Sequence, residues 1–353
     1  MATNQVNPVE ELRREIDATK RDYTELISKS SLSSVKDEFS DLDTEIANLS
    51  TRIKKTRDRK YAFNKINEQQ AADYQKQWAA KKFSIQTQIN NEANSLRNAL
   101  PALEMKVNRL QVGMASMNVV KSIKSEVENY ESRVSASENT VRQLFEGIKT
   151  EVNKLDRQLD QIEATLDHAD AASFGFLPAE SVVMAVKAVW AKDKKEDKGD
   201  PEGILFLTDQ RLLFEQKEEV ATKKVLFVTT ERELVQQLGF EVPVVSIESV
   251  KATKQGLFKN EDWLELVLAS GSFARDTRLH LDGQDSMEWQ KLISRVKTKE
   301  IDADRALAID KEAVEKVKTA PTQCPTCGGA ITKPVLRGQD SITCEFCGKV
   351  IRL

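Results

Sequence analysis

The first half of the chain is dominated by apolar residues that recur alternately three and four positions apart. Gly and Pro are almost missing between about Val9 and Leu166, and a repeat that averages about 3.5 residues places the apolar side chains on one stripe of a helix. Such stripes are typical of helices that supercoil around partner helices. We therefore predict a flexible N-terminus over residues 1–8 and an all-α coiled coil or series of helical hairpins over residues 9–170. The first stripes comprise Leu12, Ile16, Thr19, Tyr23 and Leu26, and then Val35, Phe39, Leu42, Ile46, Leu49 and Ile53.

The stripes change register in several places, which leaves two arrangements open. Breaks are predicted in the segment SKSSLSS before Val35 and around Gly113, and Pro101 is expected to kink or restart a helix. These breaks are either the turns of an antiparallel helical bundle or discontinuities in a long rod. A narrow apolar stripe on a lone helix is not stable in water, so the segment must pair with itself or with another copy. We accordingly expect a homo-oligomer.

Near Ala171 the pattern changes to short runs in which apolar residues alternate with polar ones or follow one another. Seven runs separated by polar or Gly-containing segments predict strands, and the segment after them predicts an amphipathic helix. The architecture expected for residues 171–298 is a small β-barrel or sandwich whose open end this helix covers. A further segment, TTERELVQQLGFE, has a capping box at Thr230 and Glu233 and a stop at Gly239, which predicts an inserted helix. The strands are AVKAVWA, GILFL, RLLFE, KVLFV, PVVSIESV, WLELVLA and TRLHL, and the closing helix is GQDSMEWQKLISRVKTKE.

These runs resemble the GRAM and bacterial PH-like domains over about Phe174 to Lys297. The similarity is carried by FLPAESVV, GILFLTDQRLLF, VPVVSIESVKATKQG, the segment from WLELVL to RLHL, and WQKLI, and its most specific part is Gly203–Phe214. The resemblance implies a PH-like β-barrel with a C-terminal capping helix that docks on lipid headgroups, proteins or both and has no enzymatic activity. It also implies that phosphoinositide binding would use the basic loop between the first two strands. In that loop, KDKKEDKGD, acidic residues balance the lysines, so we expect no specific headgroup binding there.

A second lysine-bearing segment, KATKQGLFKN, offers a different contact with a membrane or a partner. Leu257 and Phe258 follow Gly256 at an expected turn, where an apolar wedge could enter a bilayer while nearby lysines meet anionic headgroups. The alternative is that both side chains cap the core of the β domain. The lysines of this candidate surface are Lys251, Lys254 and Lys259.

A basic stretch in the helical half is a candidate contact for a polyanion. Tyr61 and Phe63 lie close to its basic residues, and this combination can bind phosphates or an anionic bilayer. The alternative is a solvated helix face that pairs with acidic residues of a neighbouring helix. The stretch comprises Arg52, Lys54, Lys55, Arg57, Arg59 and Lys60.

All four cysteines of the chain lie near its C-terminus, in two CxxC pairs. Such pairs place four thiolates around one tetrahedral ion, and the glycines at 328 and 348 permit the tight turns that follow. The segment resembles the zinc-ribbon family over about residues 322–353, behind a helical linker over residues 299–321. Four sulfur ligands leave no open coordination position, so we expect a structural Zn²⁺ and a ribbon that serves docking or structure, with nucleic-acid binding as the alternative. The ligands are Cys324, Cys327, Cys344 and Cys347.

Composition narrows the function classes without naming a partner. With 53 basic and 56 acidic residues the formal net charge is -3, so global charge indicates no polyanionic partner. The start of the chain has no signal-peptide pattern, and no run is long and apolar enough for a membrane span. Cysteines confined to one stretch suit a reducing compartment. We expect a cytoplasmic protein that is peripheral wherever it meets a membrane.

No residue pattern indicates catalysis. The two histidines, His168 and His280, lie in no catalytic motif, and the phosphate-binding, dinucleotide-binding and hydrolase motifs are missing from the sequence. We therefore predict a non-enzymatic, self-associating scaffold or adaptor without a small-molecule substrate. It would dock on a protein or an anionic membrane surface through the β domain and the ribbon. The alternative is a nucleic-acid-associated factor that uses the basic stretch and the ribbon.

Overall fold

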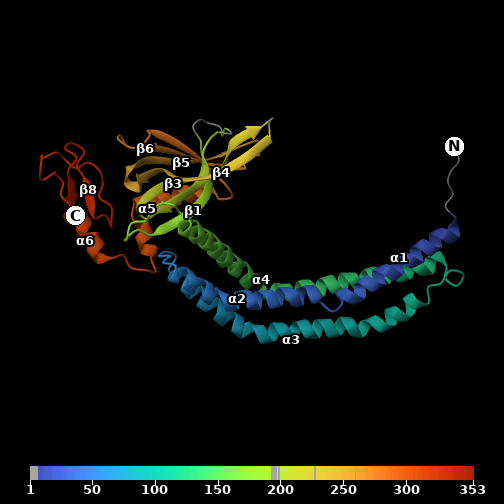
Figure 1. The fold of residues 1–353 in the computed structure, drawn as a ribbon. Helices are drawn as coiled ribbons and strands as arrows, with labels where there is room; N and C mark the ends of the chain where they lie inside the picture. Colours follow the sequence, from blue (N-terminus) through green and yellow to red (C-terminus); the bar gives the residue numbers. More distant parts are fainter. Residues whose placement is uncertain (1–6, 192–196, 198, 226–227, 259) are drawn as a thin grey trace. The chain divides into compact units, whose positions relative to one another are not determined.

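The computed structural model describes residues 7–191, 197, 199–225, 228–258 and 260–353 (Figure 1). The chain divides into two compact units, which we call the helical unit and the sheet unit. The helical unit is Met1–Ser50 with Gln69–Asp156, and the sheet unit is Thr51–Glu68 with Arg157–Leu353. None of the described helices carries the long apolar stretch that crossing a membrane requires.

Four helices account for most of the first half of the chain: α1 (Pro8–Lys29), α2 (Ser33–Asp58), α3 (Asn67–Asn108) and α4 (Met117–Asp170). α1 begins where the side chain of Asn7 accepts a hydrogen bond from the amide of Val9. Residues 1–6 of the terminus predicted to be flexible lie outside the described residues. The predicted break around Gly113 falls between α3 and α4, where Gly113 has a φ of 94°.

The restart expected at Pro101 is wrong, because α3 continues through this residue to Asn108. Proline removes one backbone hydrogen bond from a helix. On either side of it, however, Leu100 and Leu103 are buried in the core that α3 shares with other helices. Tertiary packing therefore maintains the helix where its local sequence would interrupt it.

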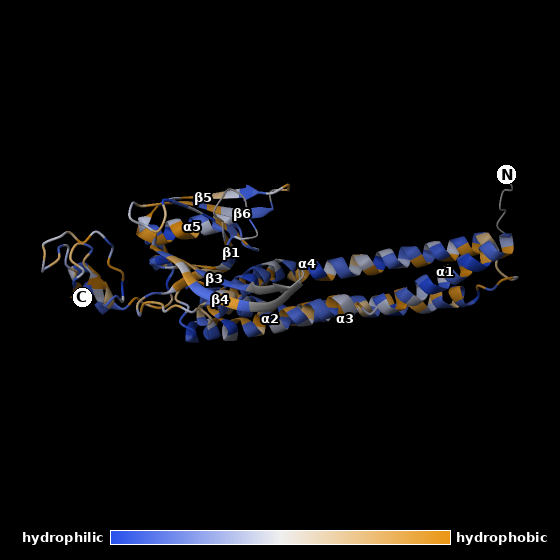
Figure 2. Ribbon diagram, turned by 45° about the horizontal axis from the view of Figure 1, so that its top comes forward, coloured by the Kyte–Doolittle hydropathy of each residue, from blue (hydrophilic) through white to orange (hydrophobic). Residues whose placement is uncertain are grey.

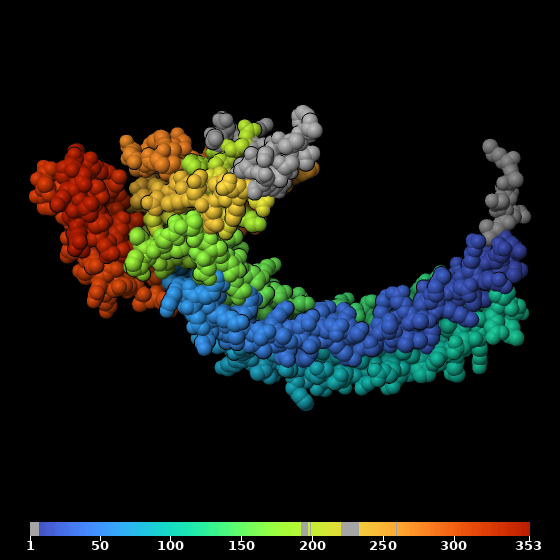
Figure 3. All heavy atoms as spheres, viewed as in Figure 1, coloured from blue at the N-terminus to red at the C-terminus, as the bar shows by residue number. Residues whose placement is uncertain are grey.

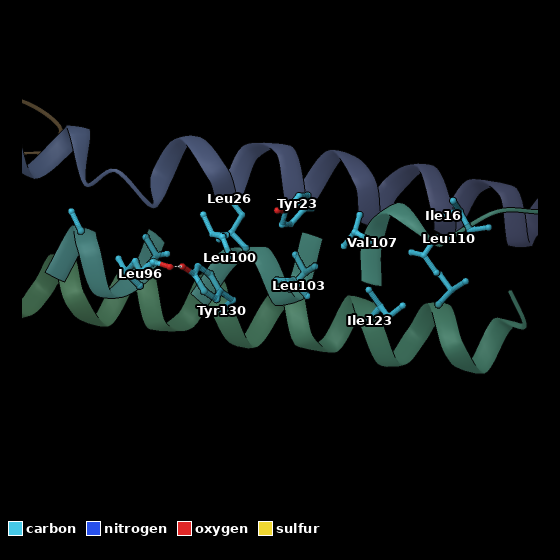
Figure 4. Close-up of a cluster of buried hydrophobic side chains, with 14 of the residues drawn as sticks. Ile16, Tyr23, Leu26, Leu96, Leu100, Leu103, Val107, Leu110, Ile123 and Tyr130 are labelled. Atoms are coloured by element: carbon cyan, nitrogen blue, oxygen red, sulfur yellow. Dashed lines mark hydrogen bonds between the residues drawn. The ribbon is translucent and has the colours of Figure 1, made fainter. Parts of the chain in front are cut away.

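The core of the helical unit is built from apolar side chains of α1, α3 and α4 (Figure 4). The hydroxyl of Tyr130 on α4 lies within this core and donates a hydrogen bond to the carbonyl oxygen of Leu96 on α3. The same helices alternate between hydrophobic and hydrophilic residues along their length (Figure 2). The members of the core are Ile16, Tyr23, Leu26, Leu32, Ala93, Leu96, Leu100, Leu103, Val107, Leu110, Val120, Ile123, Val127, Tyr130 and Val134.

The helix α2 packs against α3 and α4. The ring of Phe39 lies 5.1 Å from the ring of Trp78 on α3 and 6.4 Å from that of Phe145 on α4, measured between centroids. The chain thus folds back on itself, and the apolar stripes are covered by helices of the same chain. The stripes therefore do not by themselves require a second copy, and self-association stays a prediction.

The sheet unit contains seven antiparallel strands in the order β4-β3-β2-β1-β7-β6-β5, so that β4 and β5 are its edges. After the last strand, Asp285 caps α5 (Ser286–Lys297) by accepting a hydrogen bond from the amide of Met287. This helix buries Trp289, Ile293 and Val296. The seven-stranded antiparallel sheet followed by one helix agrees with the β domain expected from the sequence, whereas closure of the sheet into a barrel stays a prediction. The strands are β1 (Val182–Ala191), β2 (Glu202–Thr208), β3 (Arg211–Val225), β4 (Val228–Pro243), β5 (Ile247–Gln255), β6 (Glu261–Leu268) and β7 (Asp276–Leu281).

The inserted helix predicted for TTERELVQQLGFE is wrong, because this segment lies in β4 and pairs with β3. Phe214 lies opposite Phe240 with the two rings stacked, and Leu212 lies opposite Val242. Burial of these cross-strand pairs outweighs the local capping signal. The run KVLFV, predicted as a separate strand, spans the end of β3 and the start of β4, and residues 226 and 227 within it lie outside the described residues.

Short elements complete the chain. The segment predicted as a helical linker holds a 3₁₀ turn (Glu300–Asp304) and α6 (Lys311–Thr319). The C-terminal residues 322–353, which we call the ribbon, form a two-stranded antiparallel sheet of β8 (Ser341–Thr343) and β9 (Val350–Arg352). Ile351 of β9 is buried beside two of the cysteines.

Candidate metal centre and docking surfaces

Two turns of the same shape carry the four cysteines. In the first turn the amide of Cys324 donates to the carbonyl of Gly329, and the amide of Gly328 donates to the carbonyl of Cys324, both at 2.8 Å. The second turn repeats this pattern at Cys344 and Gly348, with both distances at 2.9 Å. Gly328 and Gly348 each have a φ of 72°, in the left-handed region that side chains disfavour. The sequence predicted both turns and both glycines.

The four thiols converge, as the sequence predicts. The Sγ atom of Cys324 lies 3.7 Å from that of Cys347, and the Sγ atom of Cys327 lies 3.6 Å from that of Cys344. All four sulfurs lie within 4.8 Å of one another, and among the described residues no other Cys, His, Asp or Glu group converges in this way. Sulfurs placed tetrahedrally about 2.3 Å from an ion are about 3.8 Å apart, so this arrangement fits a metal site. A disulfide requires about 2.05 Å, which neither pair approaches.

Hydrogen bonds at the two turns shift the pKa values of two of the thiols in opposite directions. The amides of Cys327 and Thr326 donate to the sulfur of Cys324 and lower its pKa to about 6. At Cys327 the amide of Gly329 acts in the same direction, but hydrogen bonds with the other thiols, first that of Cys347, outweigh it and raise the pKa to about 12. Four thiolates this close to one another require a cation between them. Four soft sulfur donors suit an ion such as Zn²⁺.

A buried carboxylate attaches the ribbon to the sheet. Asp209, in the turn between β2 and β3, has a fully buried side chain that pairs with Arg305 of the linker and Arg337 of the ribbon. It also accepts a hydrogen bond of 3.0 Å from the amide of Ser181. Burial raises the pKa of Asp209, whereas Arg337, the Ser181 amide and Arg305 act to lower it. The two arginines thus compensate for a carboxylate that the protein has removed from water.

Gln210, the residue after Asp209, holds the ribbon through two hydrogen bonds between its side chain and the backbone of Arg337. The amide of Arg337 donates to Oε1 of Gln210 at 2.5 Å, and Nε2 of Gln210 donates to the carbonyl of Arg337 at 3.1 Å. Gly338 follows with a φ of 85°, and a Cβ atom there would lie 2.9 Å from the backbone nitrogen of Ala179. The ribbon forms a lobe of its own beside the sheet in the space-filling view (Figure 3).

A second buried ion pair lies beside this turn. The side chain of Glu180 is fully buried, accepts a hydrogen bond of 2.6 Å from the hydroxyl of Thr208, and pairs with Arg211 at 2.5 Å. Arg211 also pairs with the half-exposed Glu241 at 2.5 Å. Each charge buried at the turn therefore has an opposite charge beside it.

Among the described residues of the sheet unit, the turn between β5 and β6 holds the most exposed pair of large apolar side chains. Leu257 is 92% exposed and Phe258 is 84% exposed, and Gly256 before them has a φ of 83°. Neither side chain caps the core, so the alternative considered from the sequence is wrong. The glycine permits the sharp turn that presents both side chains to solvent.

Acidic residues lie beside the described lysines around this turn. Lys254 pairs with Asp262 at 2.6 Å and with Asp285 at 3.3 Å. Lys251 is exposed and lies opposite Glu265 in the sheet register. Lys259 lies outside the described residues. Local acids therefore offset part of the positive charge at the turn.

The arginines of the basic stretch pair with acidic residues. Arg52 lies 2.7 Å from Asp160 and 2.9 Å from Glu163 of α4, measured between side-chain nitrogen and oxygen atoms. Arg59 lies 2.8 Å from both Asp167 and Asp170. This is the helix-pairing alternative considered from the sequence. Lys54, Lys55 and Lys60 are exposed.

The side chain of Arg57 forms hydrogen bonds within the protein, and the aromatic residues Tyr61 and Phe63 near it are buried. Its guanidinium donates to the carboxylate of Glu68 and to the carbonyls of Tyr61, Phe63 and Asn64, at distances from 2.6 to 3.1 Å. Tyr61 donates from its hydroxyl to the carbonyl of Val183 at 3.3 Å, and burial raises its pKa. Neither aromatic ring is available for stacking on a base.

The loop between β1 and β2 and the two histidines are the other positions considered from the sequence. In the loop KDKKEDKGD, residues 192–196 and 198 lie outside the described residues. The ring of His280 stacks on Trp263 with centroids 4.9 Å apart. Burial, followed by Lys217 and Lys187, lowers the pKa of His168.

Sequence reasoning missed the attachment of the ribbon. No role in this attachment was expected from the sequence for Asp209, Arg305 or Arg337. The signal that could have found them is the lone acid in a turn that lies between two apolar runs, GILFL and LLF. Such an acid is expected to be buried, and a buried carboxylate requires cations.

Comparisons with known proteins add little to this geometry. No family model matches the chain, and no similar curated protein was found. Among solved structures, the Vps36 N-terminal PH domain is 14% identical over 35% of this chain and 84% of that domain, with a TM-score of 0.25. A pleckstrin-homology protein of the DUF1696 family from Shewanella loihica PV-4 is 17% identical over 39% of this chain and 92% of its own, with a TM-score of 0.23. The DH/PH domains of p115-RhoGEF are 12% identical over 60% of this chain and 55% of their own, with a TM-score of 0.23.

TM-scores of this size carry no argument about the function of the chain. The description of the sheet unit therefore rests on its own strands, their antiparallel order and the helix after them. These agree with the PH-like resemblance of the sequence.

Proposed function

We propose that the chain is a non-enzymatic adaptor that docks on an anionic membrane surface through the turn between β5 and β6 and carries a structural Zn²⁺ in its ribbon. The observation that carries this proposal is the exposure of Leu257 and Phe258, at 92% and 84%. Large apolar side chains held in water gain free energy when another phase covers them. Both project from a turn, a position from which they can enter a bilayer without disturbing the sheet.

The expected attachment is weak and reversible. Burying one Leu or Phe side chain contributes about 1.5–3 kcal/mol, and one basic residue near an anionic surface about 1 kcal/mol. Lys251 can supply that charge, whereas Lys254 shares its charge with two aspartates. An attachment of this size suits a peripheral contact.

The ribbon supports the non-enzymatic part of the proposal. Cys324, Cys327, Cys344 and Cys347 would hold Zn²⁺ with all four of its tetrahedral positions filled by sulfur. The bound ion would stabilise a segment that is too short to bury a sufficient core. Elemental analysis should give one zinc per chain, and Cys344→Ser should lose it.

Vesicle flotation tests the membrane proposal. The full chain is mixed with phosphatidylcholine vesicles that contain or lack phosphatidylserine, and the fraction that floats is measured. We expect flotation with the anionic vesicles and a loss of at least about a hundredfold in partitioning for the double variant Leu257→Glu and Phe258→Glu, since two buried apolar side chains are removed. Val245→Glu is the matched control, because Val245 is 59% exposed on another part of the sheet unit.

Two outcomes would contradict the proposal. One is that the parent chain does not float with anionic vesicles, in which case the exposed pair serves a protein partner or none. The other is that the double variant floats as well as the parent or the Val245→Glu control.

A further inference from the structure

A groove of about 620 Å³ separates the ribbon from the rim of the sheet. The ribbon lines it with β8 and with apolar residues that include Pro334 and Leu336, and the sheet lines it with Val242, Pro243 and Phe273. Both walls belong to the sheet unit, and Asp209 and Gln210 hold them together. The groove is therefore a fixed feature of this unit, separate from the turn between β5 and β6.

One wall of the groove is the free edge of a strand. The amide of Leu353 donates to the carbonyl of Asp340, and the amide of Cys344 donates to the carbonyl of Lys349. In an antiparallel pair, residues alternate between facing the partner strand and facing away from it. Because 340 and 344 face β9, the N–H and C=O groups of Ser341 and Thr343 point away from it. In the described part of the chain no strand pairs with that side of β8.

The charges around the groove are balanced. Of the charged residues that line it, Arg211 pairs with Glu241 at 2.5 Å and Lys333 pairs with Glu345 at 3.0 Å. A charged occupant would find no uncompensated partner there. An uncharged occupant would find apolar side chains on both walls and a row of backbone donors and acceptors on one of them.

We propose that this groove binds an extended, uncharged peptide segment of a partner protein, which adds as a strand to the free edge of β8. The peptide backbone pairs with Ser341 and Thr343, and alternate apolar side chains of the peptide enter the space between the ribbon and the sheet rim. This inference goes beyond the membrane contact, since it concerns a different surface and a different partner.

A displayed library of random octapeptides, selected on the full zinc-loaded chain, supplies the probe. Selected sequences are synthesised with a fluorophore, and their dissociation constants are measured by anisotropy. We expect uncharged sequences in which apolar and polar residues alternate. Thr343→Pro removes one outward N–H without removing a hydrogen bond to β9, and it should weaken binding about tenfold. Thr343→Val keeps the N–H and should bind as the parent does.

Zinc content of each variant shows that the ribbon is folded. If Thr343→Pro fails to hold zinc, N-methylated peptides decide the matter with the parent chain. Methylation of the amides that would face β8 should weaken binding, and methylation of the intervening amides should not. The proposal is overturned if no peptide is selected, if neither Thr343→Pro nor N-methylation weakens binding, or if binding is lost in the Leu257→Glu and Phe258→Glu variant instead.

Discussion

Replacing Asp209 by Asn should loosen the ribbon from the sheet while leaving the metal site intact. The change keeps the size of the side chain and an oxygen that can accept from the Ser181 amide, but it removes the negative charge between Arg305 and Arg337. These arginines are 7% and 15% exposed in their side chains, so water cannot replace the lost carboxylate without structural opening.

The magnitude follows from the burial of the three groups. Breaking a buried ion pair by removing one partner costs about 3–5 kcal/mol. Arg305 retains Asp302 at 3.0 Å, which favours the lower end. A cost of about 3 kcal/mol corresponds to an increase of about a hundredfold in the equilibrium for opening the ribbon contact.

Hydrogen exchange measures this opening directly. The amide of Arg337 donates to Gln210 across the contact, so it exchanges when the ribbon leaves the sheet. A global unfolding midpoint is less suitable, because a chain with two units need not unfold in one step. We expect exchange at this amide to accelerate about a hundredfold in Asp209→Asn, with unchanged zinc content.

Asp302→Asn is the matched control, since it removes the other carboxylate from Arg305. Asp302 is 30% exposed, and a partly exposed pair is worth at most about 1 kcal/mol. The reasoning is refuted if the two variants accelerate exchange equally, or if Asp209→Asn exchanges at the parent rate.

Three further expectations follow from other parts of the molecule. Ile89→Ala should lower the free energy of unfolding of the helical unit by about 2–5 kcal/mol in circular-dichroism melts, because Ile89 is fully buried, whereas Phe83→Ala, at an 83% exposed position, should change it little. Gly348→Ala should weaken zinc affinity about fivefold in chelator competition, because a side chain at a φ of 72° costs about 1 kcal/mol. Acidification should release zinc to an indicator dye, because protons compete with the metal for the four thiolates.

Local patterns predicted much of the fold. The apolar stripes mark the buried faces of the helices, apolar runs led to six of the seven strands but not to β4, and the CxxC pairs led to the converging thiols. Each of these features depends on residues close together in sequence. The misassigned helix at 229–241 shows the limit of such reasoning, because its capping box is local whereas the pairing of β4 with β3 is not. The Asp209 contact was missed for the same reason, since Arg337 is distant in sequence and has no distinguishing neighbours.

The five donors of Arg57 have a consequence for how this chain tolerates sequence change. Its guanidinium meets three backbone carbonyls and both oxygens of Glu68, and a lysine, with three donors on one nitrogen, cannot reproduce that set. Replacing Arg57 by Lys would keep the positive charge but would remove hydrogen bonds that hold the loop. This loop contains Lys60 and Asn64, both at positive φ. Selection on this part of the chain should therefore act on shape: we expect arginine to be constrained at position 57, whereas the exposed lysines at positions 54 and 55 should tolerate exchange.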